Sequence, residues 1–238
     1  MAMLLAVRGL ACRYGGVQAL SGLDLDLAAG EVLGLIGPNG SGKSTTLDLL
    51  AGLRPSPPDT LRLAGQPIGH LPAHRRARLG LRRTFQEPRL VAALTVRENL
   101  AAALPVGRGW PWRRKDDMPW LEACGLAHDA GRLAGELSFG ARRRLELACA
   151  LSPGPRLVLL DEPAAGLTEE EVGMLGETIL RIRRAGVGVV LVDHVMRLVM
   201  AVSDRLAVLE RGCKIAEGSP AAVSADPRVR RVYLGEET

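Results

Sequence analysis

The sequence predicts an α/β fold with a mostly parallel sheet, because short apolar runs of strand type alternate with stretches of helical periodicity. The apolar runs lie at residues 32–36, 156–160 and 187–192, and the first leads through a glycine-rich turn into a helix. The first thirty residues have a β-type pattern, whereas residues from about 87 to 152 are mainly helical. We therefore expect one domain over residues 1–238, in which the parallel core carries an antiparallel β subdomain and a helical insertion.

The composition favours an aliphatic core and no membrane span. Of the 238 residues, 47% are hydrophobic and only 3% are aromatic. Apolar runs such as 187–192 are far shorter than the roughly 20 residues of a membrane-spanning helix. Residues 1–7 suggest a first strand rather than a basic leader, so we expect a cytosolic chain that docks on a membrane protein.

Charge and cysteine patterns argue against two classes of site. The formal net charge is +5, but the basic clusters are short, dispersed and not interleaved with aromatic residues. We therefore expect solvated helix faces and no nucleic-acid partner. The clusters are Arg75-Arg76, Arg82-Arg83, Arg113-Arg114-Lys115 and Arg142-Arg143-Arg144. Metal-ligand spacing is missing among the four cysteines, which we expect to be free, buried thiols: Cys12, Cys124, Cys149 and Cys213.

The first half of the chain predicts short strands around one helix. Strict alternation over residues 23–27 is typical of a half-buried strand. Thr95 and Glu98 form a capping box, which marks the start of a helix. In order, we expect a strand at 23–27, a helix at 44–51, a proline break at 55–58, strands at 61–63 and 82–86, and a helix from 95 to about 104.

The second half begins with a loop and a helical region and then returns to alternating strands and helices. Thr168 and Glu171 form a second capping box, and Ser219-Pro220 marks another helix start. The expected core stripe of the helix after Thr168 is Val172, Leu175, Ile179 and Ile182. In order, we expect a loop at 105–119, helices within 118–151 interrupted near 131–135, a strand at 156–160, a helix ended by Gly186, a strand at 187–192 and a hairpin at 205–217.

Residues 37–44 fit the phosphate-loop pattern G-x-x-x-x-G-K-[ST] at every fixed position. They are Gly37, Pro38, Asn39, Gly40, Ser41, Gly42, Lys43 and Ser44. Glycines allow successive backbone N–H groups to point inward, and the following helix presents its positive N-terminal end. Lys43 can reach the β- and γ-phosphates, and the Ser44 hydroxyl can ligate Mg²⁺. The sequence therefore predicts a nucleoside triphosphate site.

Polar residues also follow three other expected strands. Asp161 and Glu162 end an apolar strand, and because unpaired buried charge is costly, we expect Asp161 to face Mg²⁺ and Glu162 to polarise the attacking water. Gln86 and His194 close two more strands, at the edge where α/β proteins collect phosphates. Ser138 begins a helix that can bind an anion, although a helix cap explains this piece equally well.

Taken in order, these motifs resemble the ATP-binding subunits of ABC transporters over essentially the whole chain. The resemblance implies that Tyr14 stacks on adenine and that residues 37–45, ending at Thr45, form the Walker A loop. It implies that Gln86 contacts Mg²⁺ and couples to membrane domains. It also assigns Asp161 to Walker B, Glu162 to the catalytic glutamate, residues 165–168 to the D-loop and His194 to the switch histidine.

The signature motif of this family corresponds to residues 137–141 and contacts ATP held by the opposite subunit. It usually reads Leu-Ser-Gly-Gly-Gln, whereas Phe139 and Ala141 replace its third and fifth residues here. Ser138 and Gly140, the phosphate-facing pair, are kept, so the departure at Ala141 concerns fine positioning rather than ATP binding. Thr168 stands where many members have aspartate.

Longer segments resemble the ATP-binding subunits of branched-chain amino acid importers. These segments are residues 84–86, 94–100, 161–167, 193–200 and the tail at 226–235. The related subunits that energise urea uptake share much of this sequence, and residues 168–171 are slightly more similar to those subunits. The resemblance implies an ATPase that drives uptake of branched-chain or related amino acids, with urea or short amides as the alternative.

The same resemblance implies a set of partners. Two ATP-binding subunits, of the same or a related chain, close head to tail around ATP and Mg²⁺, so that Ser138 of one completes the site of the other. Two membrane permease subunits hold them at the cytoplasmic face of the membrane, and a solute-binding protein acts indirectly.

Three other classes of function stay open at this point. A soluble ABC-type ATPase of DNA repair or translation usually has two cassettes or long coiled-coil insertions, and this chain has neither. A small-molecule kinase is disfavoured by residues 137–141 and by His194. A catalytically silent, nucleotide-gated module would show no ATPase activity in the assembled complex.

Overall fold

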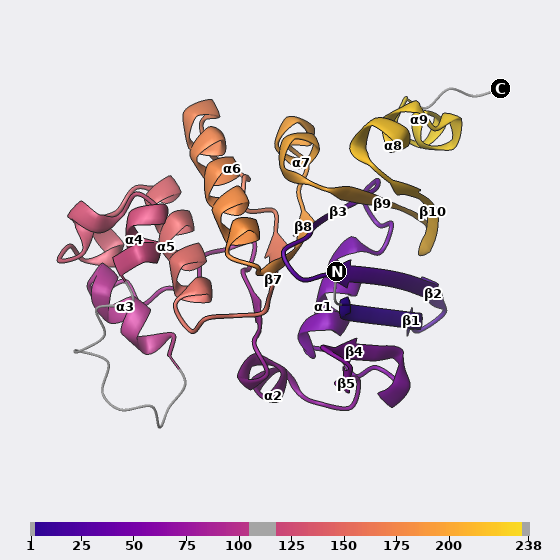
Figure 1. The fold of residues 1–238 in the computed structure, drawn as a ribbon, viewed down its shortest axis with the longest axis horizontal. Helices are drawn as coiled ribbons and strands as arrows, with labels where there is room; N and C mark the ends of the chain where they lie inside the picture. Colours follow the sequence, from indigo (N-terminus) through magenta and orange to yellow (C-terminus); the bar gives the residue numbers. More distant parts are fainter. Residues whose placement is uncertain (1–2, 105–117, 235–238) are drawn as a thin grey trace.

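The computed structural model describes residues 3–104 and 118–234, which form two β-sheets with helices packed around them (Figure 1). The smaller sheet is antiparallel and has the order β2-β1-β4-β5. Its strands are β1 (Met3–Tyr14), β2 (Val17–Ala28), β4 (Leu61–Leu63) and β5 (Gln66–Pro67). This sheet confirms the antiparallel β part expected from the first residues of the chain.

The larger sheet is mostly parallel, as the alternating strands and helices predicted. It contains β3 (Val32–Ile36), β6 (Leu81–Arg83), β7 (Leu157–Asp161), β8 (Gly188–Val192), β9 (Arg205–Glu210) and β10 (Cys213–Gly218). Their order is β10-β9-β3-β8-β7-β6. Among the described strands of this sheet, only the hairpin pair β9 and β10 is antiparallel.

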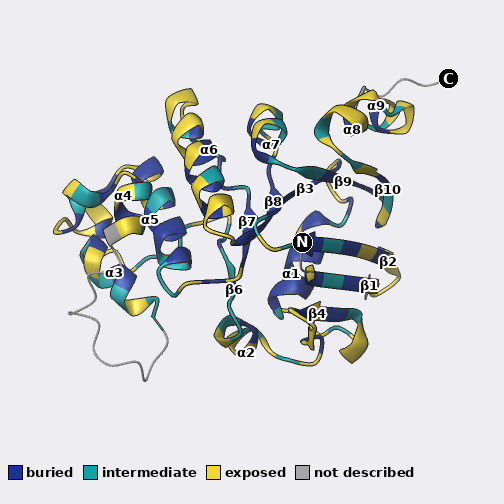
Figure 2. Ribbon diagram, viewed as in Figure 1, coloured by how far each residue is buried: buried dark blue, intermediate teal, exposed yellow. Residues whose placement is uncertain are grey.

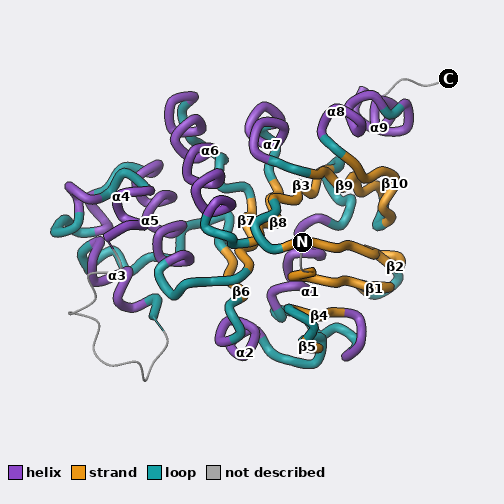
Figure 3. Tube along the Cα trace, viewed as in Figure 1, coloured by secondary structure: helices purple, strands orange, loops and turns teal. Residues whose placement is uncertain are grey.

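The helices lie mainly on the sheet faces, and three of them gather at one end of the molecule (Figures 1 and 3). They are α1 (Lys43–Ala51), α2 (Ala73–Arg78), α3 (Val96–Ala102), α4 (Met118–Ala123), α5 (Phe139–Leu151), α6 (Glu169–Arg184), α7 (Met196–Val202), α8 (Pro220–Ala225) and α9 (Pro227–Leu234). The gathered helices are α3, α4 and α5, from the predicted helical region. Within the described ranges, none of these helices is long and apolar enough to cross a membrane.

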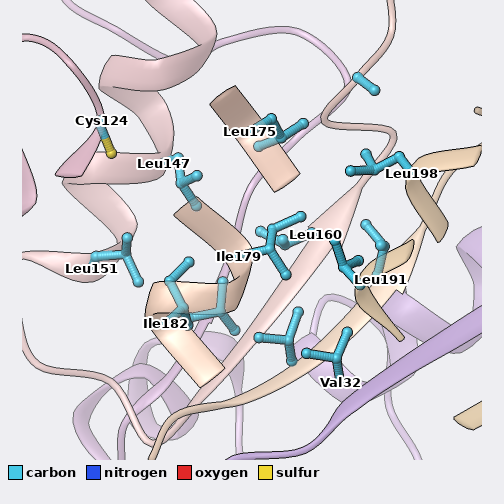
Figure 4. Close-up of a cluster of buried hydrophobic side chains, with 14 of the residues drawn as sticks. Val32, Cys124, Leu147, Leu151, Leu160, Leu175, Ile179, Ile182, Leu191 and Leu198 are labelled. Carbon is cyan, nitrogen blue, oxygen red and sulfur yellow. The ribbon is translucent and has the colours of Figure 1, made fainter. Parts of the chain in front are cut away.

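The core lies on both faces of the larger sheet, because its central strands are buried throughout (Figure 2). Alternate residues of one strand enter different clusters, as the period of a strand requires. Val32 belongs to the cluster under α6 and α7, whereas Leu33 belongs to the cluster shared with the smaller sheet and α1. In Figure 4, Ile179 of α6 lies beside Leu160 of the sheet, and Ile182 belongs to the same cluster.

Local helix signals in the sequence are confirmed. Thr95 accepts the Glu98 N–H at 3.2 Å, and the Glu98 carboxylate accepts the Thr95 N–H at 2.7 Å. Thr168 and Glu171 form the same box at the start of α6. All four residues of the expected stripe on α6 are buried: Val172, Leu175, Ile179 and Ile182.

The strand expected at 82–86 is shorter than predicted. β6 ends at Arg83, and Gln86 therefore lies beyond the strand rather than at its end. The reason is that side chains of α5 bind the Phe85 backbone in place of a neighbouring strand. Glu146 accepts the Phe85 N–H at 2.9 Å, and Arg143 donates to the Phe85 carbonyl at 2.7 Å. Of the loop expected at 105–119, residues 105–117 lie outside the described residues, and α4 begins at Met118.

The prediction that the arginine clusters form solvated faces is wrong at three positions. Arg76 is fully buried, and the side chains of Arg83 and Arg143 are only 8% and 6% exposed. Each guanidinium faces oxygen atoms of other elements, which offsets the cost of burying its charge. The remaining cluster, at 113–115, lies outside the described residues.

The cysteines follow the prediction only in part. All four are free thiols, but Cys213 is exposed on β10, and Cys12 and Cys149 are half-buried. Cys124 is the fully buried one. The scattered spacing in the sequence carries no information about which strand lies at a sheet edge, and β10 is an edge strand.

Arg76 joins the C-terminal end of α1 to the segment before α2. Its guanidinium donates to the carbonyls of Leu49 and Leu50 at 2.5 and 2.9 Å, and to those of Gly69 and Leu71 at 2.8 Å each. Leu49 and Leu50 lie in the last turn of α1, where carbonyls have no partner within the helix. We expect Arg76→Met to leave these oxygens unpaired and to lower the free energy of unfolding by about 3 kcal/mol or more.

Urea unfolding of the full chain measures this loss. Arg75→Met is the matched control, because Arg75 is exposed on the same helix, and it should change stability by less than about 0.5 kcal/mol. Equal effects of the two substitutions would contradict the assignment.

Burial raises the pKa of Glu146 to about 7, although the Phe85 N–H, Arg143 and Arg89 oppose the shift. The folded state therefore binds this proton more tightly than the unfolded state does. Its contribution to the free energy of unfolding should fall, by about 1–3 kcal/mol, as the pH rises from about 4.5 to about 7. Glu146→Gln should flatten this part of the stability profile measured by urea unfolding. Glu177→Gln, an exposed change on α6, should keep the wild-type slope; an unchanged slope in Glu146→Gln would show that another group titrates.

Candidate nucleotide-binding site

Four neighbouring parallel strands bring most of the predicted site residues to one edge of the larger sheet. β3, β8, β7 and β6 are adjacent, and their carboxyl ends face the same way. The phosphate loop follows β3, and His194 follows β8. Asp161 ends β7 with Glu162 directly after it, and Gln86 lies beyond β6. In open α/β sheets this edge is where ligands bind.

The phosphate loop is held between β2 and β9. A side chain at Gly37 would approach the Leu209 carbonyl to 2.1 Å, and one at Gly42 would approach the Ala19 carbonyl to 2.7 Å. Gly42 has φ 108° and caps α1 without a side-chain hydrogen bond. The first N–H groups of α1 are therefore not covered by a cap residue, which suits the binding of an anion.

Lys43 reaches back over the loop. Its Nζ donates to the carbonyls of Gly37 and Pro38 at 2.7 and 3.0 Å. Burial lowers the pKa of Lys43, while the charges of Glu162 and Asp161 oppose this. The ammonium group thus lies within electrostatic reach of both carboxylates. Of the neighbouring hydroxyl residues, Ser44 is exposed and Thr45 is half-buried.

Asp161 is buried and has two unlike oxygens. Arg83 donates to Oδ2 at 2.8 Å, whereas Oδ1 is buried with no hydrogen-bond partner. A buried carboxylate oxygen without a donor is costly unless something else binds it, and hard cations such as Mg²⁺ prefer such oxygens. The donor set at this edge therefore fits Mg²⁺.

Few protein side chains besides Asp161 are available as ligands for Mg²⁺ at this edge. Among the described residues, no group of three or more His, Cys, Asp or Glu side chains could hold a metal ion. Mg²⁺ is commonly bound by one or two carboxylates together with substrate phosphates and water. Ser44, at the start of α1, and Asp161 are the residues here that would hold it, and Gln86 is exposed on the loop after β6.

Glu162 and His194 are in direct contact. His194 Nε2 lies 3.0 Å from Glu162 Oε1. Glu162 has φ 49°, in the left-handed region that non-glycine residues seldom occupy, and its N–H donates to the Val192 carbonyl at 2.8 Å. Asp193 braces the same two strand ends, because its carboxylate accepts the N–H groups of Ala164 and Val195, both at 2.8 Å. Strained backbone of this kind clusters at functional sites.

Tyr14 lies beside the start of α1. Its hydroxyl is 3.5 Å from the Thr45 hydroxyl, and the ring is exposed. The Arg54 guanidinium lies 4.4 Å from the ring centre. One face of the ring is therefore covered by a cation.

Residues 138–141 are not brought to the phosphate loop within this chain. In Figure 1, α5 and α1 lie on opposite sides of β7. Ser138 caps α5 by accepting the Ala141 N–H at 3.2 Å, so the helix-cap reading applies to its side chain. A side chain at Gly140 would approach Glu171 Oε1 to 1.9 Å, because the segment packs on the start of α6. Phe139 is 44% exposed, and Ala141 is buried.

Four residues at the site were not singled out from the sequence. Arg83 and Asp48 form an ion pair at 2.6 Å, Arg54 stacks on Tyr14, and Asp193 braces the strand ends. Asp193 carried a usable signal, because it is an acid that directly follows the apolar run 187–192 and precedes His194. Arg83 belongs to an arginine pair, and such pairs were expected to be solvated, so the sequence argued against a role for it at the site.

Comparisons with known proteins agree with this geometry. A family model described as "ABC transporter" matches residues 20–165, and one described as "Branched-chain amino acid ATP-binding cassette transporter" matches residues 213–238. The chain is 38% identical to the high-affinity branched-chain amino acid transport ATP-binding protein BraF of Pseudomonas aeruginosa and 39% identical to LivG of Escherichia coli, of the same description. Each alignment covers 98% of both chains.

A solved structure of an ATP-binding cassette of an ABC transporter, in its ADP conformation, superposes with a TM-score of 0.88 at 28% identity. It covers 99% of this chain and 100% of that one. The chain therefore belongs to the ABC transporter family and is one of its ATP-binding, ATP-hydrolysing subunits.

Proposed function

We propose that this chain binds Mg²⁺ and ATP at the edge formed by β3, β6, β7 and β8, and that its ATP hydrolysis drives uptake of branched-chain or related amino acids. The observation that carries the proposal is the convergence of the phosphate loop, Asp161, Glu162 and His194 on that edge. The solute class rests on the names of the relatives BraF and LivG.

The backbone N–H groups of residues 39–45 would hold the phosphates, and Lys43 would leave its carbonyl partners to neutralise their charge. Tyr14 would stack on adenine with the ring face that Arg54 does not cover. Ser44 and Asp161 would hold Mg²⁺, with Gln86 approaching from its exposed loop. The bound ion supplies charge stabilisation for the phosphate oxygens.

Glu162 is the proposed general base. Its contact with His194 fixes the carboxylate at the mouth of the site, where it would orient and polarise the attacking water. His194 is half exposed, so it can also turn toward the γ-phosphate and stabilise charge there.

Two copies, or one copy and a related chain, would close head to tail. The support is that residues 138–141 lie away from the phosphate loop of the same chain while Phe139 is exposed. Ser138 and Gly140 would then complete the site of the opposite subunit. Permease subunits would hold this pair at the cytoplasmic face of the membrane, with the chain acting as one domain over residues 1–238 and its helical part, at about 87–152, as an insertion.

Urea or short amides are the second candidate solute class, on the basis of residues 168–171. Co-purification from membranes discriminates the two. We expect two permease chains and a solute-binding protein to accompany this chain, and the ligand of that binding protein names the solute. Recovery with soluble DNA-repair or translation factors would contradict transport.

We expect Glu162→Gln to lower ATP turnover by about 10²- to 10⁴-fold, the usual effect of losing a general base, while ATP binding is kept. Phosphate release and nucleotide binding measure the two effects separately. Glu170→Gln is the matched control, because Glu170 is exposed at the start of α6. Near-normal hydrolysis by Glu162→Gln would remove Glu162 from this role.

A mixing experiment tests the shared site. Lys43→Ala disables the phosphate loop of its own chain, and Ser138→Arg disables the segment offered to the opposite chain. We expect each variant alone to be inactive and an equal mixture to recover about a quarter of wild-type activity, because half the dimers then hold one intact site. The contrary result has two parts: the mixture recovers no activity, and the wild-type protein keeps constant activity per chain when it is diluted to monomer. Together they would show that one chain hydrolyses ATP by itself.

A further inference from the structure

Arg83 lies between two carboxylates from different elements. Its NH1 donates to Asp48 Oδ1 of α1 at 2.6 Å, and its NH2 donates to Asp161 Oδ2 of β7 at 2.8 Å. The side chain is 8% exposed, Asp161 is 4% exposed and Asp48 is 28% exposed. The guanidinium therefore connects α1, the helix after the phosphate loop, to β7, the strand that ends at Asp161.

The backbone leaves Arg83 little freedom to move away from Asp161. Arg83 is the last residue of β6 and pairs in register with Leu159 of β7. The following residue, Thr84, accepts the Asp161 N–H at 3.3 Å, and the Phe85 ring centre lies 5.4 Å from the guanidinium carbon. The guanidinium gives one donor to Asp161 and another to Asp48, so its plane is held from both sides and the donor to Oδ2 stays in place.

This contact makes the two oxygens of Asp161 unequal. Oδ2 is occupied by Arg83, and Oδ1 remains buried without a hydrogen-bond partner. A freely rotating carboxylate would offer either oxygen to any nearby cation. Lys43 is a second cation whose charge acts on Asp161 and Glu162.

We infer that Arg83 is a positioning residue for Mg²⁺ and ATP: it holds Asp161 by Oδ2 so that Oδ1 stays available to the ion, and it keeps Asp161 from pairing with Lys43. The inference rests on the proposed function, because it requires that Asp161 serve a bound Mg²⁺. Without Arg83, Arg54 would remain 3.6 Å from Asp48, and Lys43 would be a cation whose charge acts on Asp161.

The test compares ATP affinity with Mg²⁺ and with EDTA, measured by calorimetry on the full chain. The ratio of the two dissociation constants is the gain that Mg²⁺ provides. Arg83→Gln should reduce this gain by about 10- to 100-fold, the scale of a lost charge-assisted hydrogen bond, and weaken ATP binding in EDTA by less than about threefold. Arg83→Lys keeps a charge but pairs with one carboxylate at a time, so we expect a reduction of about three- to tenfold, which is about half the logarithmic loss of Arg83→Gln.

Asp48→Asn is the matched control, because it removes the ion pairs of Asp48 with Arg83 and Arg54 and leaves the contact between Arg83 and Asp161. It should lower the unfolding midpoint about as much as Arg83→Lys does, yet keep the gain from Mg²⁺ within about threefold of wild type. If the gain from Mg²⁺ is unchanged in both Arg83→Gln and Arg83→Lys, Arg83 only stabilises the fold and the inference is wrong. If Arg83→Gln does not fold, Arg83→Lys decides. If wild-type chain shows no gain from Mg²⁺ at all, the proposed function fails instead.

Discussion

The structure depends on a close packing of backbone on backbone at the turn between β3 and α1. Gly37 leaves no room for a side chain beside the Leu209 carbonyl, and Gly42 leaves none beside Ala19. The turn can therefore pack directly on β9 and β2. The helix α1 that follows begins with its first N–H groups uncovered by a side-chain cap. Because β8, β7 and β6 follow β3 in the sheet, the turn also decides which strand ends can contribute side chains to a bound phosphate.

Buried arginines connect the elements around this turn. Arg76 binds the last carbonyls of α1, so that the helix is held at the end away from the loop. Arg83 joins α1 to β7, and Arg143 joins α5 to the backbone after β6. Each of them replaces solvent with carbonyl or carboxylate oxygens at fixed positions, which the branched geometry of a guanidinium allows. The strand ends, α1 and α5 are thus linked by charge as well as by apolar packing.

Much of this could be predicted because its signals are local. The alternation in β2, the capping boxes at Thr95 and Thr168, and the phosphate-loop spacing depend on residues close together in sequence. The parallel direction of the core strands followed from the helices that connect them, whereas their order in the sheet was not predicted. The end of β6 could not be predicted, because Glu146 and Arg143, about sixty residues later, take over the hydrogen bonds of Phe85. The burial of Arg76 and Arg83 was missed for the same reason, since their oxygen partners come from other elements.

The central claim is that ATP phosphates are held by the backbone of residues 39–45 with Asp161 and Glu162 beside them. The most direct measurement is a crystal structure of the chain grown with Mg²⁺ and a non-hydrolysable ATP analogue. We predict that the β-phosphate lies within hydrogen-bond distance of backbone nitrogens of this loop and that the ion lies between Ser44 and Asp161. A nucleotide bound elsewhere, with the loop unchanged, would contradict the claim.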